Sequence, residues 1–289
     1  DMAFIEGDEI ICLSEDDDTI ADSFAKDKPS IDSSLISLDK GEPRQAEQTL
    51  FLGWNHLGMP LVTNLDGYVV PGSSIRIVSL FPPNQEAMGE RLENTDLNCL
   101  TADMSDRNIL DTLAFDKVDQ VVILCRRDLP PNLADAKTLA SLLHVRDISE
   151  EIGHEFPVIT EILDARTQEL AKTTRADDFI VSDKLVSMLL AQVSEKPRLS
   201  IVFDELLSPE GMELYFKPVT LYVAPGTATS FYTFVEAASR RNETVIGYRI
   251  GELANDPDEN FGVRLNPKKS EQYTLTEQDS LIVIADDEY

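Results

Sequence analysis

Residues 49–58 read Thr-Leu-Phe-Leu-Gly-Trp-Asn-His-Leu-Gly, an apolar run followed by a loop with two glycines. Its apolar first half predicts a buried strand at 49–54. Its second half has the spacing of the G-x-G-x-x-G loop that follows the first strand of a dinucleotide-binding fold. Gly53 and Gly58 occupy the outer glycine positions, but Asn55 stands where the second glycine belongs. The motif is therefore degenerate.

Two features that a dinucleotide site needs are absent from this stretch and its surroundings. The second glycine lets the backbone approach a pyrophosphate, and a side chain at Asn55 crowds that position. An acid should also follow the second strand to hold the ribose, yet no Asp or Glu occurs between Asp66 and Glu86. We therefore predict a Rossmann-like fold whose nucleotide site has been lost, with no cofactor-binding residues.

Outward from this stretch, apolar runs alternate with helical patterns, as in a doubly wound parallel sheet. Further strands are predicted at 75–80, 97–101, 119–125, 157–163 and 178–182, with helices at 133–144, 166–173 and 183–195. After Pro197 the pattern changes to that of a small α+β lobe. There we predict helices at 199–207 and 228–240, and strands at 212–217, 243–250, 261–265 and 280–285. The fold class is therefore α/β, a Rossmann-like sheet followed by a small α+β lobe.

The chain has 289 residues and a net charge of −28, from 53 acidic and 25 basic side chains. A surface this negative repels phosphate, so we predict no nucleic-acid partner. No apolar run is long enough to span a bilayer. Cys12, Cys99 and Cys125 are far apart and odd in number, which favours buried thiols over a disulfide framework.

The acidity is concentrated at the two ends, which also resemble each other. Residues 1–48 carry a net charge of −10 and residues 251–289 carry −7. Residues 7–17 and 278–288 share a polar turn, four apolar residues, a small residue and then acids. We interpret them as the last strands of two similar units, and the abrupt start suggests a fragment. The predicted organisation is the tail of a first unit (1–22), a linker (23–46), a Rossmann-like lobe (47–196) and an α+β lobe (197–289).

No catalytic motif is present, so we predict no catalytic residues. The chain lacks a Walker loop, a G-x-S-x-G elbow and an H-E-x-x-H pair, and its three histidines share no metal-ligand spacing. Glu161, Asp164 and Arg166 cluster at the predicted end of a strand, where α/β proteins bind ligands. A structural salt bridge is the favoured interpretation of this cluster.

Three acidic runs offer the hard oxygen ligands that Ca²⁺ prefers. They lie at 15–18, 286–288 and 255–260. The run at 255–260 is the strongest candidate, because alternating oxygen donors on a turn can converge. Asp256, Asp258 and Glu259 are therefore the candidate metal ligands, although this loop lacks the full spacing of an EF-hand. Acidic runs are more often solvated surface.

Four segments carry a family resemblance. They are Leu-Leu-His-Val-Arg-Asp-Ile at 142–148, Pro-Val-Ile-Thr-Glu-Ile-Leu-Asp-Ala-Arg-Thr at 157–167, Asp-Phe-Ile-Val-Ser-Asp-Lys-Leu-Val-Ser-Met at 178–188, and Val-Ile-Gly-Tyr-Arg at 245–249. In these segments the chain resembles the Castor and Pollux ion-channel family. The best match covers about residues 119–250, and the acidic loop at 255–260 has no counterpart in the family pattern.

The resemblance implies a cytosolic region built from RCK (regulator of potassium conductance, TrkA-like) modules. Four such subunits assemble a gating ring on the cytoplasmic face of a membrane, attached to a transmembrane pore domain. It implies a non-catalytic regulatory domain of a cation or potassium channel that pairs with itself, as a dimer or a tetrameric ring. Two alternatives stay open, a nucleotide-binding regulatory subunit of a K⁺ transporter and an NAD(P)-dependent oxidoreductase.

Overall fold

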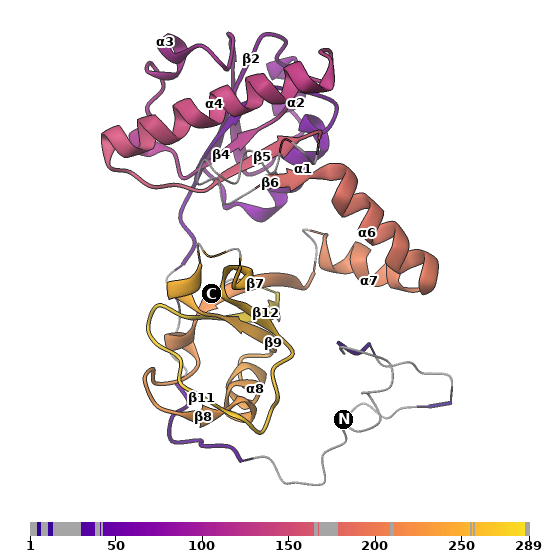
Figure 1. The fold of residues 1–289 in the computed structure, drawn as a ribbon, viewed down its shortest axis with the longest axis vertical. Helices are drawn as coiled ribbons and strands as arrows, with labels where there is room; N and C mark the ends of the chain where they lie inside the picture. The colour runs from indigo at the N-terminus through magenta and orange to yellow at the C-terminus, as the bar shows by residue number, and fades with distance from the viewer. Residues whose placement is uncertain are drawn as a thin grey trace. The chain divides into compact units, whose positions relative to one another are not determined.

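The computed structural model describes residues 5–6, 11–13, 30–37, 41, 43–164, 167, 179–208, 211–254, 256 and 258–286. The chain divides into two compact units (Figure 1). The Rossmann unit is Pro43–Gly211, and the small unit combines Asp1–Glu42 with Met212–Tyr289. The predicted lobe boundary at 196/197 and the assignment of 1–22 to a preceding unit stay predictions.

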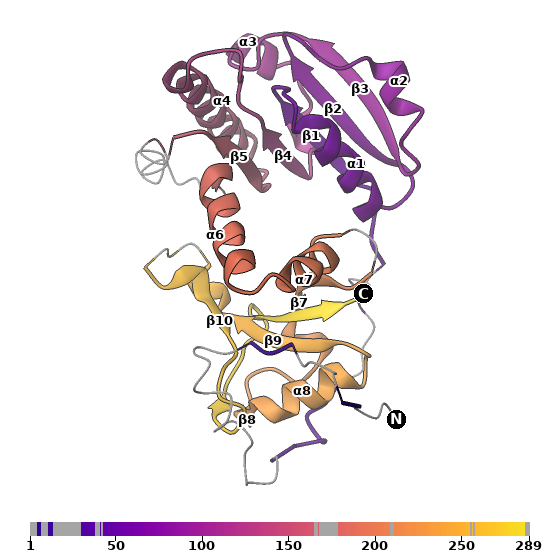
Figure 2. The same ribbon diagram turned by 90° about the vertical axis from the view of Figure 1, so that its right-hand side faces the viewer.

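A six-stranded parallel sheet forms the centre of the Rossmann unit, with the strand order β3-β2-β1-β4-β5-β6 (Figure 2). This order, 3-2-1-4-5-6, is that of a doubly wound Rossmann fold, so the predicted fold class is confirmed. All six predicted strands are present. Their bounds are β1 Gln48–Leu52, β2 Ser73–Ser79, β3 Thr95–Thr101, β4 Gln120–Ile123, β5 Val158–Ile162 and β6 Phe179–Val181.

Helices cover both faces of this sheet, and its central strands β1, β4 and β5 are buried on both sides. On one face, Leu50 and Leu52 of β1 join a core with Leu142 and Val145 of α4 (Pro131–Ile152). On the other face, Phe51 packs with residues of α1 (Gly58–Tyr68) and α2 (Gln85–Gly89). Successive residues of β1 thus point to opposite cores, as the strand period of two requires.

The helices differ from the predicted ones in several places. No helix was predicted over α1 or α2, and α1 contains Pro60, Asn64 and Gly67 and therefore has weak helix propensity. Helix α4 extends eight residues beyond the predicted end at 144 and stops at Gly153, whose φ is +65°. The predicted helix at 166–173 lies outside the described residues, apart from Thr167.

Two helices end the Rossmann unit, and both were predicted. They are α6 (Ser182–Glu195) and α7 (Leu199–Leu206), separated by a turn at Pro197. The other short helices in the described part of the chain are α3 Arg107–Leu110 and the 3₁₀ turns η3 Phe115–Lys117, η5 Val219–Leu221, η6 Gly251–Leu253 and η7 Asn260–Gly262. Among the described residues, no helix is both long and apolar enough to cross a membrane.

The small unit is an antiparallel sheet of order β10-β9-β12-β7 packed against α8 (Phe231–Ser239). Phe231 and Phe234 of α8 share a core with Leu281 and Val283 of β12. Its strands are β7 Glu213–Pro218, β9 Thr244–Arg249, β10 Val263–Leu265 and β12 Ser280–Ala285, with a second pair β8 Thr229–Ser230 and β11 Gln272–Tyr273. The predicted α+β composition is confirmed. Of the strands described in this unit, only the β8–β11 pair was not predicted, and β8 stands where the helix predicted at 228–240 was expected to begin.

Part of the predicted linker is built into the small unit. Residues 30–37, which we call the strap, lie beside the segment at 222–224. Ile36 pairs with Val223 and packs into the core of this unit. Most of the predicted repeat partner at 7–17 lies outside the described residues, so the repeat stays a prediction.

Candidate functional site

The degenerate glycine motif lies at the carboxyl end of β1, next to β4. In the strand order of this sheet, this is the switch point at which doubly wound proteins bind ligands. Gly53 has a φ of +89°, and a Cβ on it would lie 2.2 Å from the carbonyl oxygen of Leu124. Only glycine fits there.

Gly58 is required for a different contact. A Cβ on Gly58 would lie 2.5 Å from the ring of Trp54. Packing within the protein therefore explains why both outer positions of the motif are glycine, without a bound phosphate.

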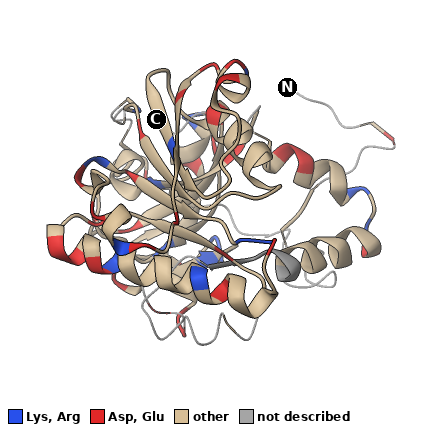
Figure 3. Cartoon of the chain, turned by 90° about the horizontal axis from the view of Figure 1, so that it is seen from above, with Lys and Arg blue, Asp and Glu red and all other residues tan. Residues whose placement is uncertain are grey.

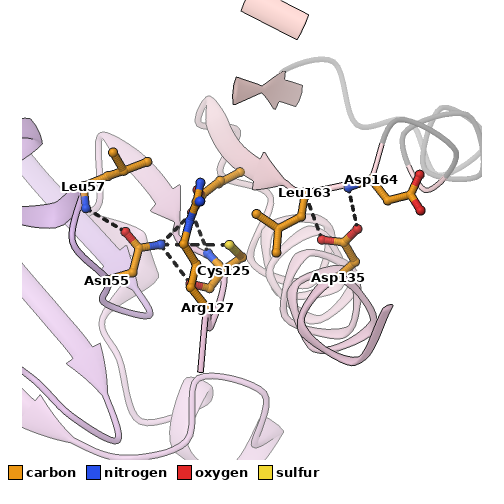
Figure 4. Close-up of polar contacts among 8 residues, drawn as sticks. Asn55, Leu57, Cys125, Arg127, Asp135, Leu163 and Asp164 are labelled. Atoms are coloured by element: carbon orange, nitrogen blue, oxygen red, sulfur yellow. Dashed lines mark hydrogen bonds and ion pairs between the residues drawn. The ribbon is translucent and has the colours of Figure 1, made fainter. Parts of the chain in front are cut away.

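Asn55, in the middle of the motif, uses both ends of its side-chain amide (Figure 4). Its Oδ1 accepts a hydrogen bond of 2.9 Å from the backbone N–H of Leu57. Its Nδ2 donates to the carbonyl oxygen of Cys125 at 2.9 Å and to Oε2 of Glu161 at 2.7 Å. The side chain thus joins the ends of β1, β4 and β5.

Glu161 of β5 is the centre of this network and is 5% exposed. Its Oε1 accepts from Nη2 of Arg127 at 2.6 Å, and its Oε2 also accepts from the backbone N–H of Cys125 at 3.0 Å. Burial raises the pKa of Glu161, but the hydrogen bonds from Arg127, Cys125 and Asn55 outweigh burial and lower the pKa overall. Glu161 is therefore an ionised carboxylate in a structural salt bridge.

Cys125 lies against this carboxylate and is fully buried. Burial raises the pKa of its thiol, and the neighbouring negative charge of Glu161 raises it further. Since the thiolate is the reactive form, a thiol that stays protonated is neither a nucleophile nor a metal ligand. The structural role expected for this cysteine fits its environment.

Asp135 of α4 fixes the chain that leaves β5. Its carboxylate accepts hydrogen bonds from the backbone N–H groups of Leu163 at 2.9 Å and Asp164 at 3.0 Å. Figure 4 shows this contact beside the network around Asn55. Of the predicted cluster of three, Glu161 and Asp164 are thus held by separate partners, and Arg166 lies outside the described residues.

These residues do not fit a dinucleotide. The side chain of Asn55 fills the place that the motif keeps open for the pyrophosphate, and its donors are already used. After β2 the chain continues through Leu80, Phe81 and two prolines, so no carboxylate follows that strand to accept a ribose hydroxyl. The arrangement instead holds three strand ends together.

The acidic loop proposed for Ca²⁺ forms part of the connection between β9 and β10. Oδ1 of Asp256 accepts from the backbone N–H groups of Asp258 at 3.0 Å and Glu259 at 3.3 Å. Oε2 of Glu259 forms a salt bridge of 2.6 Å with Arg264. In the described part of the chain, no three or more His, Cys, Asp or Glu side chains group as a metal site would need. The structure does not bring Asp256, Asp258 and Glu259 together around one point.

A second buried network lies in the small unit and was not found from the sequence. Glu243 accepts from Nζ of Lys217 at 3.0 Å and from Nε of Arg241 at 3.2 Å, and the hydroxyl of Tyr222 also donates to it. Lys217 is 1% exposed and Tyr222 is fully buried. Burial and the negative charge of Glu243 raise the pKa of Tyr222, so its hydroxyl stays a donor.

Neither the role of Arg127 nor the hydrogen bond between Asn55 and Glu161 could be predicted from the sequence, because such contacts depend on strand order. A cue existed for Asn55, since an amide at a glycine position needs partners of its own. Acidic residues outnumber basic ones along the chain and are spread over many of its elements (Figure 3), but charge alone points to no site.

Together, these observations define a Rossmann-like module with an appended α+β unit, whose switch point is filled by its own side chains. No family model matches the chain. By sequence it is a homologue of the Castor and Pollux ion channels. It is 29% identical over 282 residues to the ion channel Castor of Lotus japonicus, covering 85% of this chain and 33% of the channel. It is 27% identical over 322 residues to the probable ion channel Pollux of Arabidopsis thaliana, covering 98% of this chain and 38% of that protein.

The chain thus spans about a third of the length of the channels it matches. Among solved structures, the human SLO3 gating ring shares the fold, with a TM-score of 0.58 and 11% identity over 83% of this chain and 44% of that chain. The likeness to the GsuK channel bound to NAD is weaker, with a TM-score of 0.41 and 13% identity over 86% of this chain and 38% of that chain. It says nothing about a ligand of this chain.

Proposed function

We propose that this chain is a cytosolic regulatory part of a cation channel, positioned in a gating ring at the cytoplasmic face of a membrane. The homology to Castor over 85% of the chain carries this proposal, and the fold shared with the SLO3 gating ring supports it. In such a part, binding at the ring favours one arrangement of the units and so biases the pore.

A non-catalytic role is supported by the chemistry of the switch point. Asn55, Glu161 and Arg127 satisfy one another there. A dehydrogenase needs an open phosphate loop and a reactive group beside the cofactor, and here the buried thiol of Cys125 is held protonated. The oxidoreductase alternative is therefore disfavoured, and so is a subunit regulated by a nucleotide at this position.

Self-association is the second part of the proposal, and helices α6 and α7 support it. Leu185, Met188 and Leu190 on α6 are each more than half exposed, and so are Ile201 and Leu207 at α7 and its end. Residues 182–206 carry a net charge of only −1, although the whole chain carries −28. A nearly neutral apolar surface is where two copies of a strongly acidic chain can meet with least repulsion.

The Ca²⁺ prediction for Asp256, Asp258 and Glu259 needs its own test, since Asp256 and Glu259 would have to leave their present partners. If the loop binds Ca²⁺, calorimetry gives a saturable heat that the variant Asp256→Asn/Asp258→Asn/Glu259→Gln abolishes. No heat and no thermal shift at millimolar Ca²⁺ would remove calcium from the proposal.

The channel function is tested with the full-length protein reconstituted in lipid vesicles. We expect it to pass K⁺ or another cation, and deletion of residues 43–289 to alter that flux. A full-length protein that passes no cation would overturn the channel assignment. Micromolar binding of NAD(H) or NADP(H) by the chain, together with turnover of a substrate, would establish the oxidoreductase alternative in its place.

A further inference from the structure

One face of the Rossmann sheet is left partly uncovered at β2 and β3 by the described part of the chain. The helix that follows β3, α3, has only four residues, and its Arg107 forms salt bridges with Asp147 and Glu151 of α4. Strand β3 lies at the edge of the sheet away from α4 (Figure 2). Leu100 of β3 is accordingly 37% exposed, and Arg76 of β2 is exposed as well. A longer helix after β3 would cover this face.

A groove of about 390 Å³ lies on this face, in the amino-terminal halves of β1, β2 and β3. Its apolar wall includes Leu50 of β1, Leu113 and Val118, which belong to the core on the α4 side of the sheet. The volume lies in the lower part of the range that small-molecule sites occupy. The groove therefore has the size and the partly apolar lining of a site for a small molecule.

Two cationic side chains line this groove, and the strand pattern explains the position of the first. Ile75 and Ile77 belong to the core on the α1 side of the sheet, so Arg76 between them points to the opposite face. Its register partner in β3 is Asn98, whose side chain lies on that same face. Lys117 of η3 is the second cation of the groove.

Neither of these cations has an ion-pair partner in the described part of the chain. Other cations of the same unit are paired, among them Arg107, Arg127 and Lys137. Asp96 is the one acid among the lining residues, so two bases against one acid give the groove a net charge of +1. The whole chain carries −28. The groove is therefore a local site of positive charge on a strongly acidic protein, which favours an anionic ligand there.

We propose that this groove binds a small organic dianion, a phosphate monoester or a dicarboxylate, with Arg76 and Lys117 as its charge partners. Two cations suit two negative charges, and the amide of Asn98 supplies a further donor. The apolar wall at Leu50 and Val118 receives the carbon part of the ligand. The groove lies toward the amino ends of the strands, so it is separate from the filled switch point at their carboxyl ends. It is also independent of the proposed channel function.

The first test is calorimetry on the 289-residue chain at neutral pH, with glycerol 3-phosphate, succinate and inorganic phosphate as three separate probes. We expect one of the two organic dianions to give a saturable heat with one ligand per chain, and the probe that does so identifies the kind of ligand. The absence of a saturable heat with both organic dianions at millimolar concentration would overturn the proposal. A heat from inorganic phosphate alone would show an adventitious ion only and would overturn it too.

The second test places the ligand in the groove. Arg76→Gln and Lys117→Gln should each weaken binding about tenfold, because each removes a charged hydrogen-bond donor. Asp96→Asn removes the acid of the groove and should tighten binding about threefold. The matched control is Arg91→Gln, which removes an exposed cation of the same unit outside the groove and should bind as the parent chain does.

The variants also separate a specific site from an effect of overall charge, since R76Q, K117Q and R91Q change the net charge equally. If R91Q weakens binding as much as R76Q and K117Q do, the ligand responds only to overall charge and the proposal fails. Arg76, Lys117 and Asp96 are all exposed, so these variants should fold as the parent does, and Trp54 fluorescence during urea denaturation checks this. In D96N, tighter binding is a gain of function that unfolding cannot produce.

Discussion

Nδ2 of Asn55 lies 2.7 Å from Oε2 of Glu161, although 106 residues separate them in the sequence. The contact joins the end of β1 to β5 on the far side of β4, at the edge where relatives of this fold open a ligand crevice. Because Arg127 neutralises the same carboxylate, the network is complete without any added group. The switch point of this chain is a structural joint.

Removing the amide of Asn55 should destabilise the Rossmann unit. In Asn55→Ala the carboxylate of Glu161 and the carbonyl oxygen of Cys125 each lose a donor. We expect a loss of about 3 kcal/mol in the free energy of unfolding. Trp54, the only tryptophan of the chain, lies in this unit, so its fluorescence during urea denaturation measures that unit. Asn98→Ala, at an exposed position of β3, should change the value by less than about 0.5 kcal/mol. Equal changes in the free energy of unfolding in the two variants would contradict a stabilising role of the Asn55 amide.

The network around Glu161 also predicts how the stability of the Rossmann unit depends on pH. The pKa of Glu161 is lowered in the folded protein, so its contribution is present above its ordinary value of 4.5 and is lost as the pH falls through the lower folded pKa. In Glu161→Gln this part of the acid sensitivity should be missing, and the neutral-pH stability should be lower. Unfolding followed by Trp54 fluorescence from neutral pH to below 4.5 measures both. If the free energy of unfolding depends on pH in the same way in the parent and in the variant, an ionised Glu161 is ruled out as a stabilising group.

The buried network of the small unit should be equally sensitive. Glu243→Gln leaves the cation of Lys217, which is 1% exposed, without its carboxylate. We expect a loss of about 3–5 kcal/mol in the stability of the small unit. Hydrogen exchange of the β9 and β12 amides measures this unit separately. The matched variant Glu236→Gln, which removes the exposed helical pair with Arg240, should cost no more than about 0.5 kcal/mol. Similar exchange in both variants would show that the network is not a source of stability.

The apolar surface of α6 should control self-association. Leu185 and Met188 lie three residues apart on one face of the helix, and they are 53% and 56% exposed. The double change to Asp should convert an oligomer to a monomer in analytical ultracentrifugation. The control is the double change to Asp at Leu133 and Leu143 of α4, which are 47% and 50% exposed. A chain that is monomeric before any change, or an oligomer that survives the α6 variant, would refute this interface.

The central strands were predictable because each is a short apolar run between turn residues, and burial on both faces leaves such a run with few alternatives. Helix α1 was not predicted because Pro60 and Gly67 have low helix propensity. The helix forms because packing against β1 compensates for this weak propensity. The motif at Gly53, Asn55 and Gly58 could be recognised as degenerate. The contacts of Asn55 could not be predicted, because Asn55 meets Glu161 only once the order of β1, β4 and β5 is known. The strap was read as a linker for the same reason, since its polar composition does not reveal that Ile36 has a partner at Val223.

The close approach at Gly53 has a consequence for how such chains are recognised. Its missing Cβ makes room for the Leu124 carbonyl, so this glycine would persist under selection for folding alone. A search that scores glycine-rich loops would therefore count this chain among nucleotide binders because of glycines that packing alone explains. In chains with this fold, the middle position of the loop, here Asn55, is the informative one. The residue type at this position shows whether the loop leaves space for a phosphate or fills that space with a side chain.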